Sequence, residues 1–210
     1  MARYLGSKCR ICRREGSKLF LKGNRCSTER CSFVKRPYAP GEKGKMGKVT
    51  KASYYAQQLR EKQKVKRMYG ILERQFRKYF HEAARVKGKT GRALIQLLER
   101  RLDNVIFRLL FAVSRNQARQ IVRNGFVYVN GRKVNIPSFL VKKDDKIQVK
   151  MKQKQAFAKD NLEVASKSRS VPAWLFQDKE NFRGEILRLP EKEDLVLPIN
   201  DQMIIELYSK

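Results

Sequence analysis

The sequence predicts an α+β protein: a cysteine-rich N-terminal segment, a mainly helical domain, and an inserted module of helices packed on a small antiparallel sheet. Three observations lead to this prediction. All four cysteines fall within residues 1–36. Apolar residues recur every three or four positions across residues 53–111, as in amphipathic helices. Short alternating runs flank Asn130-Gly131, a pair that suits a tight hairpin turn.

The cysteines are spaced as two close pairs, Cys9-x2-Cys12 and Cys26-x4-Cys31. Four thiolates without an open position describe a structural zinc site, and an intracellular setting disfavours disulfides. One zinc ion would hold a segment that is too small for a core of its own. An iron–sulfur cluster, which uses the same ligands, and four reduced thiols remain the alternatives.

The helical domain follows a basic loop over residues 37–48, which Pro and Gly punctuate and which is a candidate for phosphate contact. Residues 53–86 predict one long helix or two, because Ser53 can cap the start and Gly70 weakens continuity. Residues 92–111 predict a second strong helix, rich in leucine.

The module continues with a short helix from Ser114 to Asn124-Gly125, strands on each side of the hairpin turn, and a third strand at 146–150. Residues 152–167 also have a helical pattern. Three arginines of the short helix, Arg115, Arg119 and Arg123, are four residues apart. They share one face, and we expect this face to be exposed and to bind phosphates.

The charge points to a polyanionic partner. The 210 residues include 49 Lys and Arg against 20 Asp and Glu, a net charge of +29, and residues 1–101 carry most of the excess. Nucleic acid neutralises such a charge best, because each bound phosphate releases counterions. A membrane partner is not expected, since no stretch approaches the ~18 apolar residues of a span and residues 1–6 lack a signal core. The prediction is a cytoplasmic protein.

A resemblance to a known RNA-binding motif rests on three runs. They are Arg101–Arg108, the helix that begins Ser114-Arg115-x-x-Ala118-Arg119, and the hairpin Gly125-x-Val127-x-Val129-Asn130-Gly131-x-x-Val134. Together these runs resemble the alpha-L RNA-binding motif. That motif also occurs in some pseudouridine synthases, bacterial tyrosyl-tRNA synthetases and a small heat-shock protein.

The rest of the chain resembles the bacterial family of small-subunit ribosomal protein number four. The matching runs are Ala2–Gly6, Arg13–Gly16, Pro40-Gly41, Gln58–Val65 and Glu206–Lys210. The resemblance implies three parts: a zinc-binding segment at 1–45, a helical domain at 46–95 completed by 175–210, and the alpha-L module at 96–174. Some members of the family carry the four cysteines and others do not.

The family resemblance also implies a function. Members are structural components of the small ribosomal subunit that bind the 5′ domain of 16S rRNA and nucleate subunit assembly. They lie near the mRNA entry channel beside other ribosomal proteins and affect translational accuracy. Some members repress translation of their own mRNA. The expected partners are therefore 16S rRNA, mRNA and neighbouring ribosomal proteins, with no membrane and no small-molecule substrate.

The expected site residues form three groups. The predicted metal ligands are Cys9, Cys12, Cys26 and Cys31. The predicted RNA-binding residues are Arg3, Arg10, Arg13, Arg14, Lys22, Arg25, Lys35, Arg36, Lys43, Lys45, Lys48, Lys51, Arg60, Lys62, Lys64, Arg67, Arg74, Arg115, Arg119, Arg123, Asn130 and Arg132. Of these, Lys43, Lys45, Lys48 and Lys51 are assigned to mRNA by the resemblance. Acidic residues of the tail, Glu191, Asp194, Asp201 and Glu206, are expected to contact a basic protein neighbour.

No catalytic residues are expected. His81 is the only histidine, and the spacing Gly41-x-x-Gly44-x-x-Gly47 lacks the strand and helix of a phosphate-binding loop. The alternatives are an RNA-modifying enzyme subunit and a free RNA-binding regulator that uses the same module. Only about 60 residues follow residue 150, too few for a separate catalytic domain of ordinary size.

Overall fold

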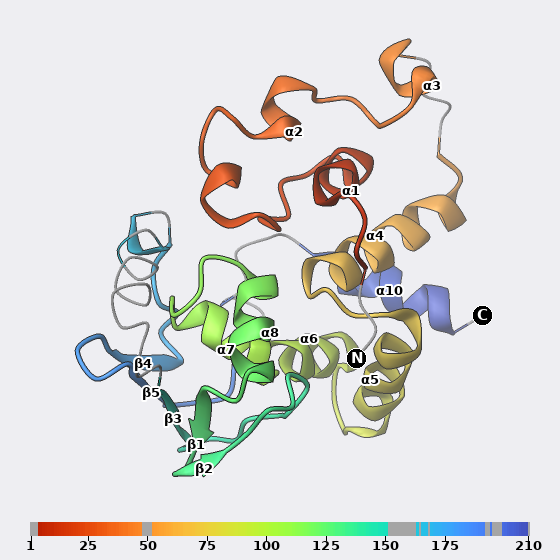
Figure 1. Ribbon diagram of the computed structural model, residues 1–210. Helices are drawn as coiled ribbons and strands as arrows, with labels where there is room; N and C mark the ends of the chain where they lie inside the picture. The colour runs from red at the N-terminus through yellow and green to blue at the C-terminus, as the bar shows by residue number, and fades with distance from the viewer. Residues whose placement is uncertain are drawn as a thin grey trace. The chain divides into compact units, whose positions relative to one another are not determined.

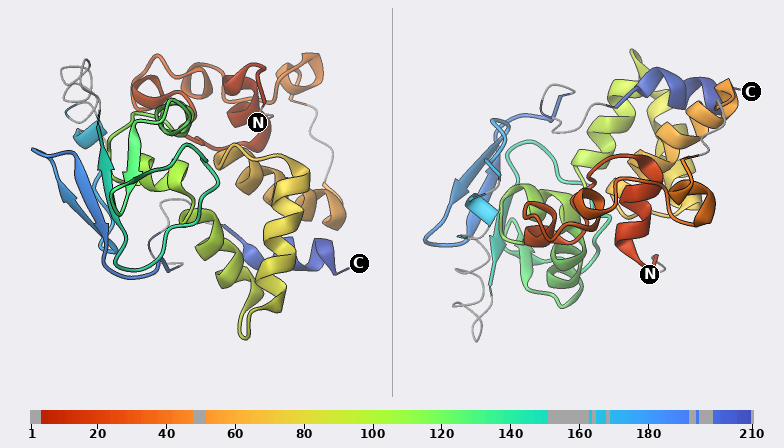
Figure 2. Two further views of the ribbon diagram at one scale, coloured as in Figure 1. Left: turned by 60° about the horizontal axis from the view of Figure 1, so that its bottom comes forward. Right: turned by 90° about the horizontal axis from the view of Figure 1, so that it is seen from above.

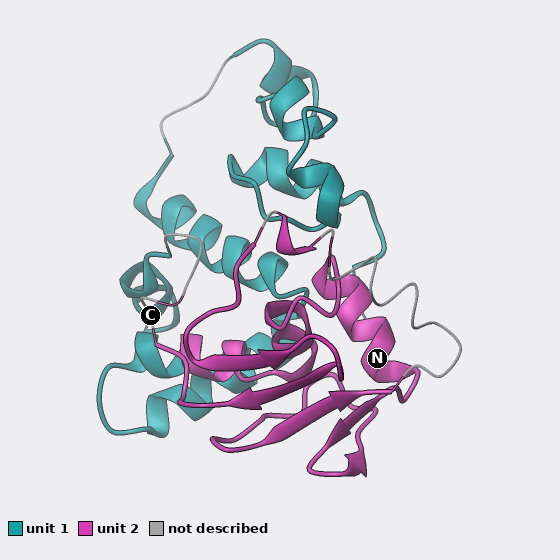
Figure 3. Ribbon diagram, turned by 90° about the vertical axis from the view of Figure 1, so that its left-hand side faces the viewer, with its two compact units in different colours: residues 1–94, 197–210 teal, residues 95–196 magenta. Residues whose placement is uncertain are grey.

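The computed structural model describes residues 4–47, 52–150, 163, 165–167, 169–191, 194 and 199–209. The chain forms two compact units (Figure 3). Unit 1 comprises residues 1–94 and 197–210, and unit 2 comprises residues 95–196. The predicted boundaries differ from this division, because the N-terminal segment belongs to the helical unit and residues 175–196 belong to unit 2. No helix in the described part of the chain is long and apolar enough to cross a membrane.

The N-terminal part of unit 1 consists of short helices. They are α1 (Lys8–Glu15), the 3-10 helix η1 (Gly23–Cys26), α2 (Ser32–Lys35) and α3 (Glu42–Lys45). Gly16 ends α1 in the left-handed conformation, with φ 63°. Among the described residues of this part, the buried apolar cluster consists of Ile11, Cys12, Leu19 and Leu21, with Phe33 packed against it. The segment therefore has a very small core, as its composition suggested.

The remainder of unit 1 is built from α4 (Tyr54–Met68), α5 (Glu73–Arg85) and α10 (Asp201–Tyr208) (Figure 1). The predicted region 53–86 forms two helices, and Gly70 turns the chain between them with φ 65°. Ser53 caps α4 as predicted, since its Oγ accepts from the Ala56 amide at 3.2 Å. Helix α10 packs against α4, so residues far apart in the sequence close this unit.

Unit 2 begins within α6 (Thr90–Glu99) and continues into α7 (Leu102–Arg108) and α8 (Arg115–Arg123). The prediction of one helix over residues 92–111 was wrong, because Arg101 is extended at ψ 133° and bridges to Leu140. The Leu102 amide then donates to the Phe139 carbonyl at 2.8 Å, in place of a bond within one continuous helix. Ser114 caps α8 as predicted, accepting from the Gln117 amide at 3.3 Å.

The sheet of unit 2 contains β1 (Val127–Val129), β2 (Arg132–Lys133), β3 (Lys146–Val149), β4 (Leu175–Asp178) and β5 (Arg183–Ile186). It is antiparallel in the order β2-β1-β3-β5-β4, with the strands labelled in Figure 1 and shown from two further sides in Figure 2. Asn130 and Gly131 form the predicted hairpin turn, with φ values of 49° and 79°. Helices α7 and α8 pack on the sheet around a core that includes Trp174, which is fully buried. The helix predicted for 152–167 lies mostly outside the described residues.

Candidate nucleic-acid interface

The four cysteines gather in the N-terminal part of unit 1 as free thiols. Cys9 is half-buried and the other three are buried. Burial raises the pKa of the Cys12 thiol, and the nearby charges of Cys26, Cys9 and Cys31 raise this pKa further. The Lys22 amide is 3.4 Å from the Cys26 Sγ and donates to it, a contact that favours the thiolate form.

The donor set of this cysteine cluster fits a tetrathiolate metal site in its chemistry, because four sulfurs share one neighbourhood next to an amide donor. The four side chains are not, however, arranged as closely as in a metal site. Within the described ranges, no three His, Cys, Asp or Glu side chains are arranged so that they could hold a metal ion. The cluster therefore supplies the ligand types that zinc prefers.

The N-terminal part also carries many exposed cations. The predicted RNA-binding residues that are exposed here are Arg10, Arg14, Lys22, Arg25, Lys35, Arg36, Lys43 and Lys45. Arg13 is turned inward instead: its Nε donates to the Tyr38 carbonyl at 2.9 Å and its guanidinium lies 4.8 Å from the Tyr38 ring centre. Arg3, Lys48 and Lys51 lie outside the described residues.

Two basic residues of α4 are paired with a carboxylate of α1. Arg60 and Arg67 both form ion pairs with Glu15, the first at 3.4 Å. The Glu15 side chain is only 1% exposed. Burial raises the pKa of this carboxyl, and the two arginines oppose that rise. These predicted RNA-binding arginines thus neutralise a buried carboxylate that joins two elements of unit 1.

The lysines of α4 are also paired. Lys62 and Lys66 each donate to Glu73 at 2.8 Å, and Lys64 lies 3.3 Å from Glu61. Burial acts to raise the pKa of Glu73, but hydrogen bonds from Lys62, Lys66 and Tyr208 outweigh it and lower the pKa to about 2. The predicted RNA-binding residues Lys62 and Lys64 therefore already have anionic partners within the fold.

The arginines of α8 do not share an exposed face, so that prediction was wrong. Arg123 is exposed, but Arg119 is only 6% exposed and its Nη1 donates to Asp103 at 3.1 Å. Burial lowers the pKa of Arg119, and the charge of Asp103 opposes this change. Arg115 is half-buried, and its Nε donates to Asn104 at 2.8 Å. The reason is that α7 packs against α8 and offers polar partners on the same side.

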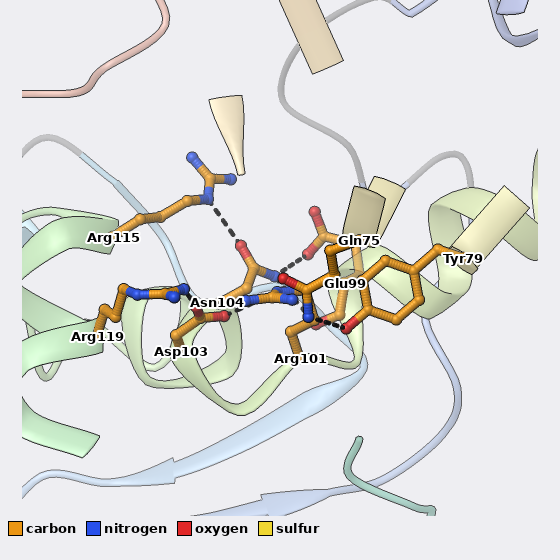
Figure 4. A network of polar contacts seen from close by, with 8 residues as sticks. All are labelled: Gln75, Tyr79, Glu99, Arg101, Asp103, Asn104, Arg115 and Arg119. Atoms are coloured by element: carbon orange, nitrogen blue, oxygen red, sulfur yellow. Dashed lines mark hydrogen bonds and ion pairs between the residues drawn. The ribbon is translucent and has the colours of Figure 1, made fainter. Parts of the chain in front are cut away.

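A buried polar network lies beneath α8, and the sequence reasoning did not anticipate it (Figure 4). Arg101 donates from Nε and Nη2 to the two oxygens of Asp103 at 3.1 and 2.7 Å, and Arg119 joins them from α8. One signal for the network was present in the sequence, namely charged residues inside a dense apolar helical pattern. Charges in such positions need partners, because burying a lone charge is very costly.

The same network continues around Glu99. Arg108 binds both oxygens of Glu99 at 2.8 and 2.9 Å, and the Asn104 Nδ2 donates to it at 2.7 Å. Through its Oδ1, Asn104 then receives the hydrogen bond from Arg115 (Figure 4). The network thus fixes α7 relative to the first turn of α8, which is the frame on which Arg123 is presented.

Arg169 is a further cation that sequence reasoning missed. Its guanidinium lies 4.0 Å from the centre of the Phe107 ring, against which Arg115 also packs, at 4.4 Å. Arg169 donates to the carbonyls of Phe107 and Ala112 at 3.2 and 3.0 Å. Burial, with the charges of Arg115 and Arg108, lowers its pKa to about 10. No spacing or composition signal marked this residue.

Of the two hairpin residues predicted to bind RNA, Asn130 stabilises the turn and Arg132 is exposed. Asn130 holds the turn, since its Nδ2 donates to Asp145 at 2.8 Å and its Oδ1 accepts from the Lys146 amide at 2.9 Å. Arg132 and Lys133, on β2, are exposed. The hairpin therefore presents two cations on a turn whose shape the Asn130 side chain fixes.

The acidic residues of the tail are largely engaged within the chain. Glu206 accepts from Gln58 at 2.9 Å and from Tyr54, and Asp194 binds Arg188 through both oxygens at 2.9 Å. Asp201 lies in the first turn of α10. Glu191 is the most exposed of the four predicted residues, with 64% of its side chain accessible. Contact with a protein neighbour stays a prediction for all four.

Comparison with known proteins relates two adjoining stretches of the chain to one family. The family model described as the ribosomal protein S4/S9 N-terminal domain matches residues 3–99, and the S4 domain matches residues 100–147. The chain is 57% identical to the small ribosomal subunit protein uS4 of Nitratidesulfovibrio vulgaris over 210 residues, which covers both chains completely. It is 56% identical to uS4 of Thermoanaerobacter sp. over 211 residues, again with complete coverage of both chains. These relatives have the names of ribosomal proteins, not of enzymes, in agreement with the absence of an expected catalytic set. The chain belongs to the uS4 family of small ribosomal subunit proteins.

Proposed function

We propose that this protein is a structural component of the small ribosomal subunit that binds the 5′ domain of 16S rRNA directly and nucleates subunit assembly. The observation that carries the proposal is the exposed basic surface of a chain that matches uS4 proteins over its whole length. The net charge of +29 favours a polyanion, and exposed arginines can fork onto phosphate oxygens.

Buried and exposed cations have different roles in this fold. Arg101, Arg108 and Arg119 neutralise buried carboxylates and hold α7 and α8 in place. Arg123 and Arg132 are exposed on the frame that results. RNA therefore meets a surface whose shape is fixed in advance, which reduces the entropy lost on binding.

The test is binding of the purified chain to a 16S 5′-domain fragment over a range of salt concentrations. The affinity should fall steeply and linearly on a logarithmic salt axis, because phosphate neutralisation releases counterions. Sucrose-gradient sedimentation of a lysate should place the protein with the small subunit. Binding that ignored salt would contradict the phosphate mechanism. Absence from the small-subunit fraction would favour a free regulator or a modifying enzyme subunit.

We also propose that the loop containing Lys43, Lys45, Lys48 and Lys51 lies near the mRNA entry channel and affects translational accuracy. Lys43 and Lys45 are exposed in α3, which supports this assignment. Replacing the four lysines by alanine should weaken mRNA unwinding and alter misreading by reconstituted ribosomes. A control with four alanines at the exposed positions Lys87, Lys89, Lys167 and Lys179, outside the S4 domain, removes the same charge. Equal activity of the two variants would refute the assignment.

We propose that Cys9, Cys12, Cys26 and Cys31 hold one structural zinc ion. The small core of this segment supports the proposal, because a metal adds folding free energy that four buried apolar residues cannot supply. Purified protein should contain about one zinc per chain. A Cys26→Ser variant should lose the metal, and tryptic cleavage within residues 1–45 should then accelerate. Iron in place of zinc, with visible absorbance, would identify a cluster, and no metal at all would leave reduced thiols.

Repression of the protein's own mRNA is a further proposed activity of the same basic surface, by analogy with some members of the family. It predicts that the purified protein lowers translation of its own message in a reconstituted system and that added 16S 5′-domain RNA relieves this effect. Unchanged translation at saturating protein would exclude it.

A further inference from the structure

Helix α5 has two chemically different faces. One face is apolar and buried, with Phe76 and Ala83 fully inaccessible. The other face is basic and exposed. Its residues, which we call the α5 basic face, are Arg74, Arg77, Lys78, His81 and Arg85. The sequence reasoning had selected only Arg74 among them.

The α5 basic face lacks the internal partners that α4 has. All five cations of α4 pair with Glu15, Glu61 or Glu73. By contrast, Arg74, Arg77 and Arg85 make no ion pair with any residue that the structure describes. Lys78 approaches Glu82 at 3.8 Å with 75% of its side chain exposed, and such an exposed pair is weak. The charge on α5 is therefore available to an outside partner.

The shape of this face suits an extended anion. The five basic residues, with Glu82, line a shallow groove of about 400 Å³. Arg74, Arg77, Lys78, His81 and Arg85 follow one another at steps of one, three or four residues. At 1.5 Å per residue, the stripe from Arg74 to Arg85 is roughly 16 Å long. That length can follow a run of phosphates, whereas a single small anion would occupy only part of it.

The composition favours RNA over a protein partner. Protein interfaces have apolar or aromatic side chains at their centre, but the large apolar side chains of α5 are all buried. Exposed large apolar residues, Leu72 and Val86, occur only beyond its two ends. Interfaces with nucleic acid are more polar and much more positive than protein interfaces.

We propose that the α5 basic face is a second docking surface for the sugar–phosphate backbone of rRNA, made of residues that belong neither to the S4 domain nor to the cysteine-rich N-terminal segment. The proposal rests on the proposed RNA-binding function and assigns it to residues of α5. Arginine forks and the Lys78 ammonium would contact phosphate oxygens, so this surface adds affinity without reading the base sequence. The cations of α4, in contrast, mainly stabilise the fold.

The test compares two triple variants with equal loss of charge. One is Arg77→Gln/Lys78→Gln/Arg85→Gln on α5, and the control is Lys167→Gln/Lys179→Gln/Arg183→Gln, three exposed positions of unit 2 outside the S4 domain. Both are measured against the 16S 5′-domain fragment, with no other protein present. At ~0.15 M salt the α5 variant should bind about tenfold more weakly than the control. Its logarithmic salt slope should be smaller by about 2 to 3, roughly one for each lost phosphate contact.

The wild-type measurement separates the two levels of the proposal. Tight, salt-dependent binding by the wild type with equal affinities and slopes for both variants would overturn the α5 assignment and leave the proposed function standing. Failure of the wild type to bind would overturn both. A circular-dichroism melt checks that the α5 variant is folded, and the changed side chains all point to solvent.

A second readout needs no mutation. Acylation of lysine side chains, quantified by mass spectrometry, should be slowed at Lys78 when the RNA fragment is bound. Lys179, on the turn between β4 and β5, serves as the internal control. Equal acylation of Lys78 with and without RNA would contradict the proposal even if both triple variants had lost affinity.

Discussion

At the scale of single residues, the most consequential side chains are charged groups that do not face solvent. Arg101 is fully buried, and Asp103 and Arg119 are nearly so. Three charges can share such a site only because each has a partner, since removing one partner leaves an uncompensated charge in a medium of low polarity.

Asp103→Asn is therefore expected to destabilise unit 2 by about 3–5 kcal/mol, because two buried guanidiniums lose the carboxylate that they share. Urea denaturation followed by Trp174 fluorescence would measure this loss. Asp144→Asn is the matched control: Asp144 is exposed with φ 64°, a conformation that asparagine tolerates. Equal stability of the two variants would refute a structural role for the network.

The lowered pKa of Glu73 predicts that the free energy of unfolding depends on pH. Its pKa is lowered from the ordinary 4.5 to about 2 in the folded protein. The carboxylate therefore stabilises the fold fully above about pH 4.5, and this contribution is lost as the pH falls toward 2. Glu73→Gln should lower the urea midpoint at pH 7 relative to wild type, and the gap should close at acidic pH. A gap of constant size from pH 7 to 2.5 would contradict this.

Residue-level prediction from sequence succeeded where the chemistry is local. Ser53, Ser114 and the Asn130-Gly131 turn act through neighbours within a few positions, so their roles could be read in advance. Arg119 could not be placed in the same way. Four-residue spacing fixes which residues share a helix face, but only the packing of α7 decides that this part of the face is buried.

At the scale of elements, α10 illustrates stabilisation by a short, distant segment. The Tyr208 ring stacks on Phe80 with 4.6 Å between centroids, and its hydroxyl donates to Glu73 at 2.7 Å. An eight-residue helix is not stable alone in water, so these contacts must hold it. Burial, with the charge and hydrogen bond of Glu73, raises the pKa of Tyr208, so its hydroxyl stays protonated as a donor.

Tyr208→Ala should accordingly destabilise unit 1 by about 2 kcal/mol, less than for a fully buried aromatic residue because Tyr208 is only half-buried. The measure is the urea midpoint of the helical circular-dichroism signal. Tyr55→Ala removes an equally large side chain that is 55% exposed, and it should change stability little. Similar midpoints for the two variants would show that α10 does not depend on its aromatic contact.

Glycine and cap residues indicated some element boundaries: Gly70 made two helices one of the two alternatives for residues 53–86, and the chain does turn there. The break between α6 and α7 was missed because leucines continue the helical period through Arg101, where the extended backbone pairs with Leu140. A contact 39 residues away in sequence leaves no trace in local periodicity. Residues 175–186, which form β4 and β5, had been assigned to the helical domain for the same reason, whereas β5 pairs with β3 in unit 2.

At the scale of the whole molecule, two units with separate cores should unfold in distinguishable steps. The single tryptophan, Trp174, is buried in unit 2 and reports on that unit alone. Tyr208→Ala should therefore shift the helical transition to lower urea and leave the Trp174 fluorescence transition in place. If both signals moved together, the units would form one cooperative block.

The overall charge and the presence of an RNA module were evident from the sequence, but the division of that charge was not. The sequence alone does not distinguish the cations that neutralise Glu15 and Glu73 from the cations that remain exposed. Arg67 and Arg77, ten residues apart, differ only in what the folded chain places beside them.

The order of the two units along the chain has a consequence for synthesis. Unit 2 is a continuous stretch, whereas unit 1 is interrupted by it and is closed by α10. A translating ribosome therefore completes the strands of unit 2 before it makes the helix that covers α4 and α5. The nascent chain passes through a stage in which the hairpin can already form but Tyr208, which stacks on Phe80 in the folded protein, has not yet been synthesised. Premature termination before residue 201 should consequently yield chains that chaperones and proteases recognise by their uncovered aromatic rings.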